Sequence, residues 1–209
     1  MQASSTQSIQ KRAAWLRIMT QIHWISAAIG LVGMLFFAAT GIMLNNAEHF
    51  ENAMPVSTHH AATLPPALLA TLNAQAANKA LPDELKQWVS SNWDIRLSPK
   101  RTDWRDEEIF VDLPRPGVDA WLSVNRHSGA IEYQADDRGW VAFFNDLHKG
   151  KNAGPIWSGF ITAFGIACLV FSISGLLILQ VHAKSRWIVW PITGLGLIVP
   201  LVLLLLFVH

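Results

Sequence analysis

The sequence has 209 residues, of which 51% are hydrophobic and 15% are charged, and its formal net charge is +1. These values lie at the apolar edge of soluble proteins, so the distribution of the apolar residues along the chain decides the class. The single cysteine, Cys168, excludes a disulfide within the chain and a cysteine metal cluster, and we expect no nucleic-acid partner.

A first transmembrane helix is predicted over residues 23–46, after a cytoplasmic segment of residues 1–22. The run from Trp24 to Leu44 carries no charge and, at about 1.5 Å per residue, is long enough to cross a hydrocarbon core of ~30 Å. It is also longer than the apolar core of a typical signal peptide, and Asn and Glu residues follow it in place of a small-residue cleavage site. We therefore expect a membrane anchor that is not removed.

A small domain of residues 47–147 is predicted next, with one helix packed on an antiparallel sheet. Residues 47–78 favour a loop and a short helix, and apolar spacing predicts a helix over residues 82–93. Residues 140–144 favour an amphipathic helix at the membrane surface. Alternating side chains and turn residues predict four strands, at residues 94–99, 108–113, 120–124 and 130–134.

Two more transmembrane helices follow in the prediction. Residues 148–182 form a juxtamembrane segment and the second helix, residues 183–187 a cytoplasmic loop, and residues 188–209 the third helix. All 15 acidic residues lie between Glu48 and Asp146, so the short flanks before the first helix and between the last two carry basic charges only. By the positive-inside rule these flanks are cytoplasmic, which puts the middle domain and the C-terminus outside.

Histidines at the predicted helix ends are the candidate functional residues, because ionisable side chains are rare in membrane helices. His23 and His182 are expected at similar depth on the cytoplasmic side, where two imidazoles can hold a haem iron. On the outer side, His148 and His209 form a second candidate pair, with His49 as a substitute.

The same histidines also allow an interpretation without a cofactor. A histidine at a membrane interface is often an anchor or a helix cap, and small residues on two helices let the helices touch without any cofactor. The pair His59–His60 favours a solvated loop of the middle domain.

Several elements carry a resemblance to a known family: Phe144-Asn145-Asp146-Leu147-His148-Lys149-Gly150-Lys151 with Gly154 and Trp157, Ser174-Gly175-Leu176-Leu177, Ala39-Thr40-Gly41-Ile42 with His23, and the turns Pro116-Gly117 and Ser128-Gly129 within residues 112–129. Together they resemble the PepSY-associated transmembrane family of bacterial inner membranes. The resemblance implies a membrane α-helical fold of three transmembrane helices with a small α+β PepSY-like periplasmic domain.

The resemblance further implies haem-b electron transfer in iron acquisition, because some family members resemble reductases of ferric iron or ferric siderophores. It carries over to His23 and His148, whereas His182 and His209 are added from the predicted topology. Larger members have more helices, so a homodimer is expected to complete the cofactor sites.

We therefore expect a transmembrane electron-transfer protein with two haem b groups, because one porphyrin does not cover a ~30 Å barrier. A cytoplasmic or quinone donor would reduce an inner haem, an outer haem would reduce ferric iron or a ferric chelate, and a separate transporter would import ferrous iron. Two alternatives stay open: a membrane-anchored binding module, and a metal-handling accessory subunit without a redox cofactor.

Overall fold

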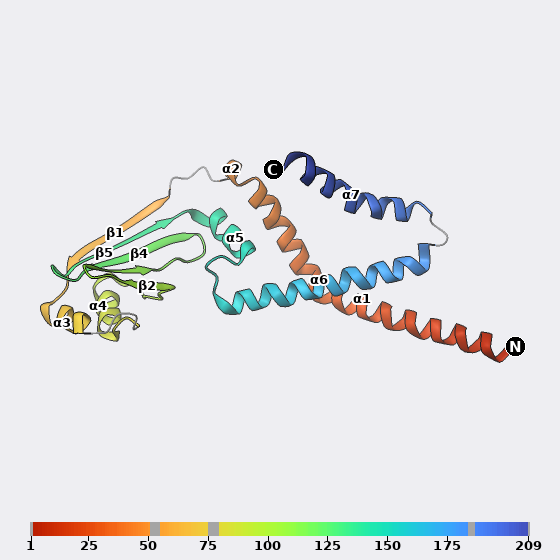
Figure 1. Ribbon diagram of the computed structural model, residues 1–209, viewed down its shortest axis with the longest axis horizontal. Coiled ribbons are helices and arrows are strands. Elements are labelled where there is room, and N and C mark those ends of the chain that lie inside the picture. Colours follow the sequence, from red (N-terminus) through yellow and green to blue (C-terminus); the bar gives the residue numbers. More distant parts are fainter. Residues whose placement is uncertain (1, 51–54, 75–79, 184–186, 209) are drawn as a thin grey trace. The chain divides into compact units, whose positions relative to one another are not determined.

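The computed structural model describes residues 2–50, 55–74, 80–183 and 187–208. The elements follow the order α1 (Gln2–Asn45), α2 (Ala47–Phe50), β1 (Val56–Thr63), α3 (Pro66–Ala74), α4 (Asp83–Trp93), β2 (Arg101–Trp104), β3 (Glu108–Asp112), β4 (Val118–Asn125), β5 (Ala130–Asp137), α5 (Gly139–Lys149), α6 (Gly154–His182) and α7 (Val189–Phe207) (Figure 1). The chain divides into two compact units, one of residues 1–36 with 160–209 and one of residues 37–159.

Three helices in the described part of the chain are long and apolar enough to cross a membrane: Gln10–Asn45 within α1, α6 and α7. None of the described residues of α7 is buried, and its large side chains from Leu201 to Phe207 are exposed. Such a surface is stable against lipid and not against water. The predicted three-helix membrane protein is therefore confirmed.

Helices α1 and α6 of the first unit pack through small residues. A Cβ atom at Gly33 would collide with the Phe164 ring, and one at Gly30 would lie 4.0 Å from the Sγ of Cys168. As the α1 residue number falls, the number of its α6 partner rises, so the two helices run antiparallel. Close approach at glycine is a common way for membrane helices to pack, since lipid provides no hydrophobic force between them.

The second unit contains a five-stranded antiparallel sheet in the order β1-β5-β4-β3-β2. Helices α3 and α4 cover one of its faces (Figure 1). Their side chains Leu72, Leu85 and Val89 are fully buried with alternate residues of the central strands. The fully buried strand residues are Ile109, Val111, Leu122, Val124 and Ile131. The predicted helix-on-sheet domain is confirmed.

Two predictions for this domain are wrong. Residues 94–99 form no strand, because Asp94 adopts a left-handed conformation (φ 55°) that ends α4, and the chain then packs Leu97 on the core without a strand partner. Residues 47–78 contain the expected short helix, α3, but the expected loop holds the strand β1, which adds to β5 at the edge of the sheet. His59 and His60 therefore lie in a strand and not in a solvated loop. The polar sequence of β1 carries no clear strand pattern, because this strand is stabilised by pairing with β5, which is distant in sequence.

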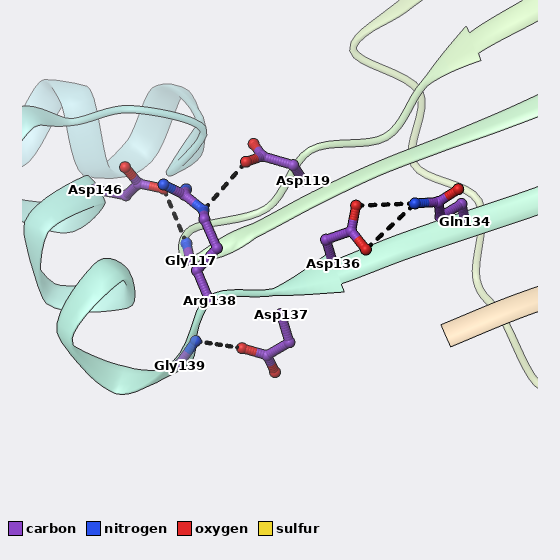
Figure 2. A network of polar contacts seen from close by, with 8 residues as sticks. All are labelled: Gly117, Asp119, Gln134, Asp136, Asp137, Arg138, Gly139 and Asp146. Atoms are coloured by element: carbon purple, nitrogen blue, oxygen red, sulfur yellow. Dashed lines mark hydrogen bonds and ion pairs between the residues drawn. The ribbon is translucent and has the colours of Figure 1, made fainter. Parts of the chain in front are cut away.

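A buried carboxylate fixes α5 to the sheet. Asp146, 3% exposed, accepts hydrogen bonds from the Gly117 amide (2.9 Å) and from the Arg138 guanidinium (2.8 Å). Gly117 has φ 73°, and a Cβ there would lie 2.9 Å from the Phe143 backbone, so this turn needs glycine to admit the helix. Figure 2 shows the network, in which Arg138 also pairs with the more exposed Asp119 at 3.1 Å.

The two carboxylates beside Arg138 provide a matched pair of variants. We expect Asp146→Asn to destabilise the sheet domain by about 2 kcal/mol, because the half-buried Arg138 guanidinium loses the charge of its buried partner. Asp119→Asn should cost less than about 1 kcal/mol, because that side chain is 55% exposed. Thermal unfolding of the detergent-purified protein, followed by circular dichroism, measures both. Equal shifts in Tm for the two variants would contradict this account.

Candidate histidine sites

In the first unit, the His23 ring of α1 docks on one turn of α6. Its Nδ1 atom lies 3.1 Å from the Phe171 carbonyl oxygen and 3.2 Å from the Ser174 hydroxyl. The ring stacks on Phe171 with centroids 4.5 Å apart and planes at 17°. A Cβ at Gly175 would lie 3.1 Å from the His23 Cε1, so the glycine makes room for the imidazole.

In the second unit, the His148 ring of α5 docks on one turn of α1 in the same manner. Its Nδ1 atom lies 2.8 Å from the Thr40 hydroxyl, and its ring lies 5.1 Å from the Phe37 ring at 45°. A Cβ at Gly41 would lie 3.4 Å from the His148 Cε1. Glycine again lies beneath the imidazole.

The two docking turns share one sequence pattern, Phe-x-x-[Ser/Thr]-Gly, at residues 37–41 and 171–175. In each, the phenylalanine ring contacts the imidazole, stacked at His23 and tilted at His148, the hydroxyl contacts Nδ1 and the glycine leaves space. In each, the hydroxyl also donates to the carbonyl of that phenylalanine, at 3.0 Å from Ser174 and 3.2 Å from Thr40. We call these two arrangements the His23 site and the His148 site.

These contacts select the protonation form of both rings. A carbonyl oxygen only accepts, so the bond to Phe171 requires a proton on Nδ1 of His23. The Thr40 hydroxyl has one proton and also contacts the Phe37 carbonyl, so a proton on Nδ1 of His148 satisfies both contacts. A neutral imidazole with its proton on Nδ1 has its lone pair on Nε2. This is the form in which histidine binds a metal while its other nitrogen is held by the protein.

An apolar groove of about 260 Å³ lies next to the His23 site on the same two helices. It is lined by Ile22, Ile25, Ser26 and Ile29 of α1 and by Ala167 and Val170 of α6. The Ser26 hydroxyl donates to the Ile22 carbonyl at 2.8 Å, so its polar group is satisfied within its own helix. The groove therefore offers an apolar surface to a flat apolar ligand.

The His148 site is held by the end of α5. Gly150, with φ 68°, ends the helix, and its amide donates to the Leu147 carbonyl. The Trp157 indole N–H donates to the same carbonyl at 2.9 Å. The Asp146 carboxylate anchors the turn before His148, and the Trp157 bond holds the end of the helix after it. The backbone is therefore held on both sides of this histidine.

The profile of PepSY_TM-like proteins matches residues 14–209. The chain belongs to the PepSY_TM-like family. No match was found among curated proteins or among solved structures. Both histidine sites lie within the part of the chain that matches the PepSY_TM-like family.

The other candidate histidines of this PepSY_TM-like chain lie differently. His182 is exposed, bonds the Ile178 carbonyl of its own helix at 2.9 Å, and follows Gly175 by seven residues, a rise of about 10 Å along α6. The fold does not bring its backbone level with the His23 site. His49 is exposed at the end of α2, and His209 lies outside the described residues. No group of three or more His, Cys, Asp or Glu that could hold a metal occurs within the described residues.

Sequence reasoning missed the residues that hold the rings. It identified Thr40-Gly41 and Ser174-Gly175 as family elements without assigning them a histidine. The signal was present, because the pattern Phe-x-x-[Ser/Thr]-Gly occurs once in each of two membrane helices.

The two sites differ in a way that an experiment can resolve. We expect both His23 and His148 to carry their proton on Nδ1. Thr40→Val should remove this preference at His148, because the hydroxyl is the partner of Nδ1 there. Ser174→Ala should leave His23 unchanged, because the Phe171 carbonyl still accepts.

The ¹⁵N chemical shifts of histidine-labelled protein in lipid nanodiscs report the tautomer, and His23→Gln and His148→Gln assign the signals. Nε2 protonation of His148 in the unaltered chain would refute the assignment. So would a Thr40→Val spectrum identical to that of the unaltered chain.

Proposed function

We propose that this protein transfers single electrons across a membrane through haem b and reduces ferric iron or a ferric chelate for iron uptake. The observation that supports this is the paired docking of His23 and His148. Each ring is held through Nδ1 on a neighbouring helix, and the proposal gives the Nε2 lone pair to an iron ion.

The residues present suit a porphyrin. Glycines at positions 41 and 175 admit the imidazoles against the helix backbone, and the groove beside the His23 site is apolar. In the proposal, His23 and His148 would hold the iron through Nε2, and Thr40 and Ser174 would orient the rings. A haem held there would supply one-electron chemistry by cycling between ferric and ferrous iron.

In this proposal each site would draw a further iron ligand from elsewhere in the assembly. The offset of His182 along α6 favours a ligand from a second copy of the chain for the His23 site. A homodimer would supply such a ligand and would place more helices around each porphyrin.

We further propose the bacterial inner membrane as the location, with the N-terminus in the cytoplasm and the sheet domain in the periplasm. The distribution of charge supports this orientation, since acidic residues occur only between Glu48 and Asp146. The electron donor would be a quinol or a cytoplasmic reductant. The product ferrous iron would pass to a separate transporter.

The visible absorption spectrum of the protein tests the haem. We expect detergent-purified protein, expressed with ample haem, to show a sharp b-type α-band after dithionite reduction. His23→Ala and His148→Ala should each reduce the haem content per chain, measured as the pyridine haemochrome. His127→Ala is the matched control, because that side chain is exposed in the β4–β5 turn, and it should retain full haem content.

A colourless protein under these conditions would overturn the proposal. Equal haem content in the His23, His148 and His127 variants would also count against it, because the haem would then be bound elsewhere.

A further inference from the structure

The sheet domain contains a cavity of about 590 Å³ that is separate from both histidine sites. It opens where the last turn of α4 and the chain after it meet the sheet. Its lining comes from α4 and its C-terminal extension, from β1 and β5, and from the ends of β3: Thr58, His60, Ser90, Trp93, Asp94, Ile95, Arg96, Ser98, Leu113, Arg115, Tyr133 and Ala135. Volumes of about 300–1,000 Å³ are typical of small-molecule sites.

One wall of the cavity is aromatic. His60 of β1 and Tyr133 of β5 are directly opposite each other in the sheet register, with ring centroids 6.2 Å apart. Trp93 at the end of α4 stacks on His60 at 5.4 Å with planes at 21°. Trp88 packs edge-on against Trp93 at 5.5 Å and fixes its plane. Three rings held in this way favour a flat, unsaturated ligand.

The remaining lining combines the apolar residues Ile95, Leu113 and Ala135 with polar residues that carry an excess of positive charge. Arg96 and Arg115 face one carboxylate, that of Asp94, in a segment of the chain where acidic residues outnumber basic ones. Neither arginine forms an ion pair with another described residue. By contrast, Arg138 and Arg101 both pair with aspartates of the domain. Two guanidinium groups without partners suit a carboxylate, which they bind through paired hydrogen bonds.

We propose that this cavity binds an aromatic carboxylate. The ring would lie against Trp93, His60 and Tyr133, and the carboxylate would pair with Arg96 and Arg115. Asp94 would accept a hydrogen bond from a hydroxyl or amino group of the ligand. The inference is independent of haem, because the cavity and the two histidine sites share no lining residue.

The test uses the full-length protein in detergent and isothermal titration calorimetry with 6-hydroxy-2-naphthoate. The matched ligand is 6-hydroxy-2-naphthamide, which has the same rings and hydroxyl group but no negative charge. We expect saturable binding of the carboxylate, about tenfold or more tighter than that of the amide.

Arg96→Gln and Arg115→Gln should each weaken naphthoate binding about tenfold and leave the amide unaffected. Arg105→Gln is the control, because it removes an exposed arginine outside the cavity and lowers the net charge equally. All three side chains are exposed, so the variants should fold.

Absence of saturable naphthoate binding would overturn the proposal. Equal affinity for carboxylate and amide would do the same, as would an Arg105→Gln loss equal to that of Arg96→Gln. Each readout is separate from the visible spectrum, so a protein without haem can still bind naphthoate and a haem protein can fail to bind it.

Discussion

An imidazole in a membrane helix must find its hydrogen-bond partner within the protein, because hydrocarbon provides none. This chain meets that requirement for His23 of α1 by docking the ring on a turn of α6 that offers the Ser174 hydroxyl. His148 of α5 docks in the same way on the Thr40 hydroxyl of α1. The small residues that the turns need at positions 41 and 175 are then required by the histidines as well as by helix packing. A single constraint thus accounts for the ring contacts, the glycines and the polar side chains at both sites.

The sheet domain provides the rigidity that the His148 site needs. α5 has a buried carboxylate, Asp146, only two residues before His148, and this carboxylate is tied to Gly117 and Arg138. A histidine on a free juxtamembrane segment would lose side-chain and backbone entropy on docking against α1. Because α5 is already ordered by the sheet, most of that cost is met when the domain folds.

Sequence patterns predicted the elements whose signal is local. Three elements can each be recognised from a short stretch of sequence: the charge-free run before Asn45, the helix ending at Trp93 and the hairpin at Ser128-Gly129. β1 was missed because Val56–Thr63 is mostly exposed and depends on pairing with β5, some 70 residues further along. The aromatic wall at His60 and the arginine pair were missed for the same reason, since each joins residues distant in sequence.

The two histidine sites contain the same types of residue, but the His23 ring is packed more closely than the His148 ring. At His23 the ring is nearly parallel to Phe171, has two acceptors at Nδ1 and lies close enough to Gly175 that a Cβ would be crowded at 3.1 Å. At His148 the ring is tilted by 45°, and a Cβ at Gly41 would be at 3.4 Å. His23 is therefore the more tightly constrained ring. His148 has more freedom to adjust its plane, and among the described contacts its Nδ1 meets the Thr40 hydroxyl alone. Substituting alanine for glycine should accordingly disturb the first site more than the second, because the close approach is tighter there.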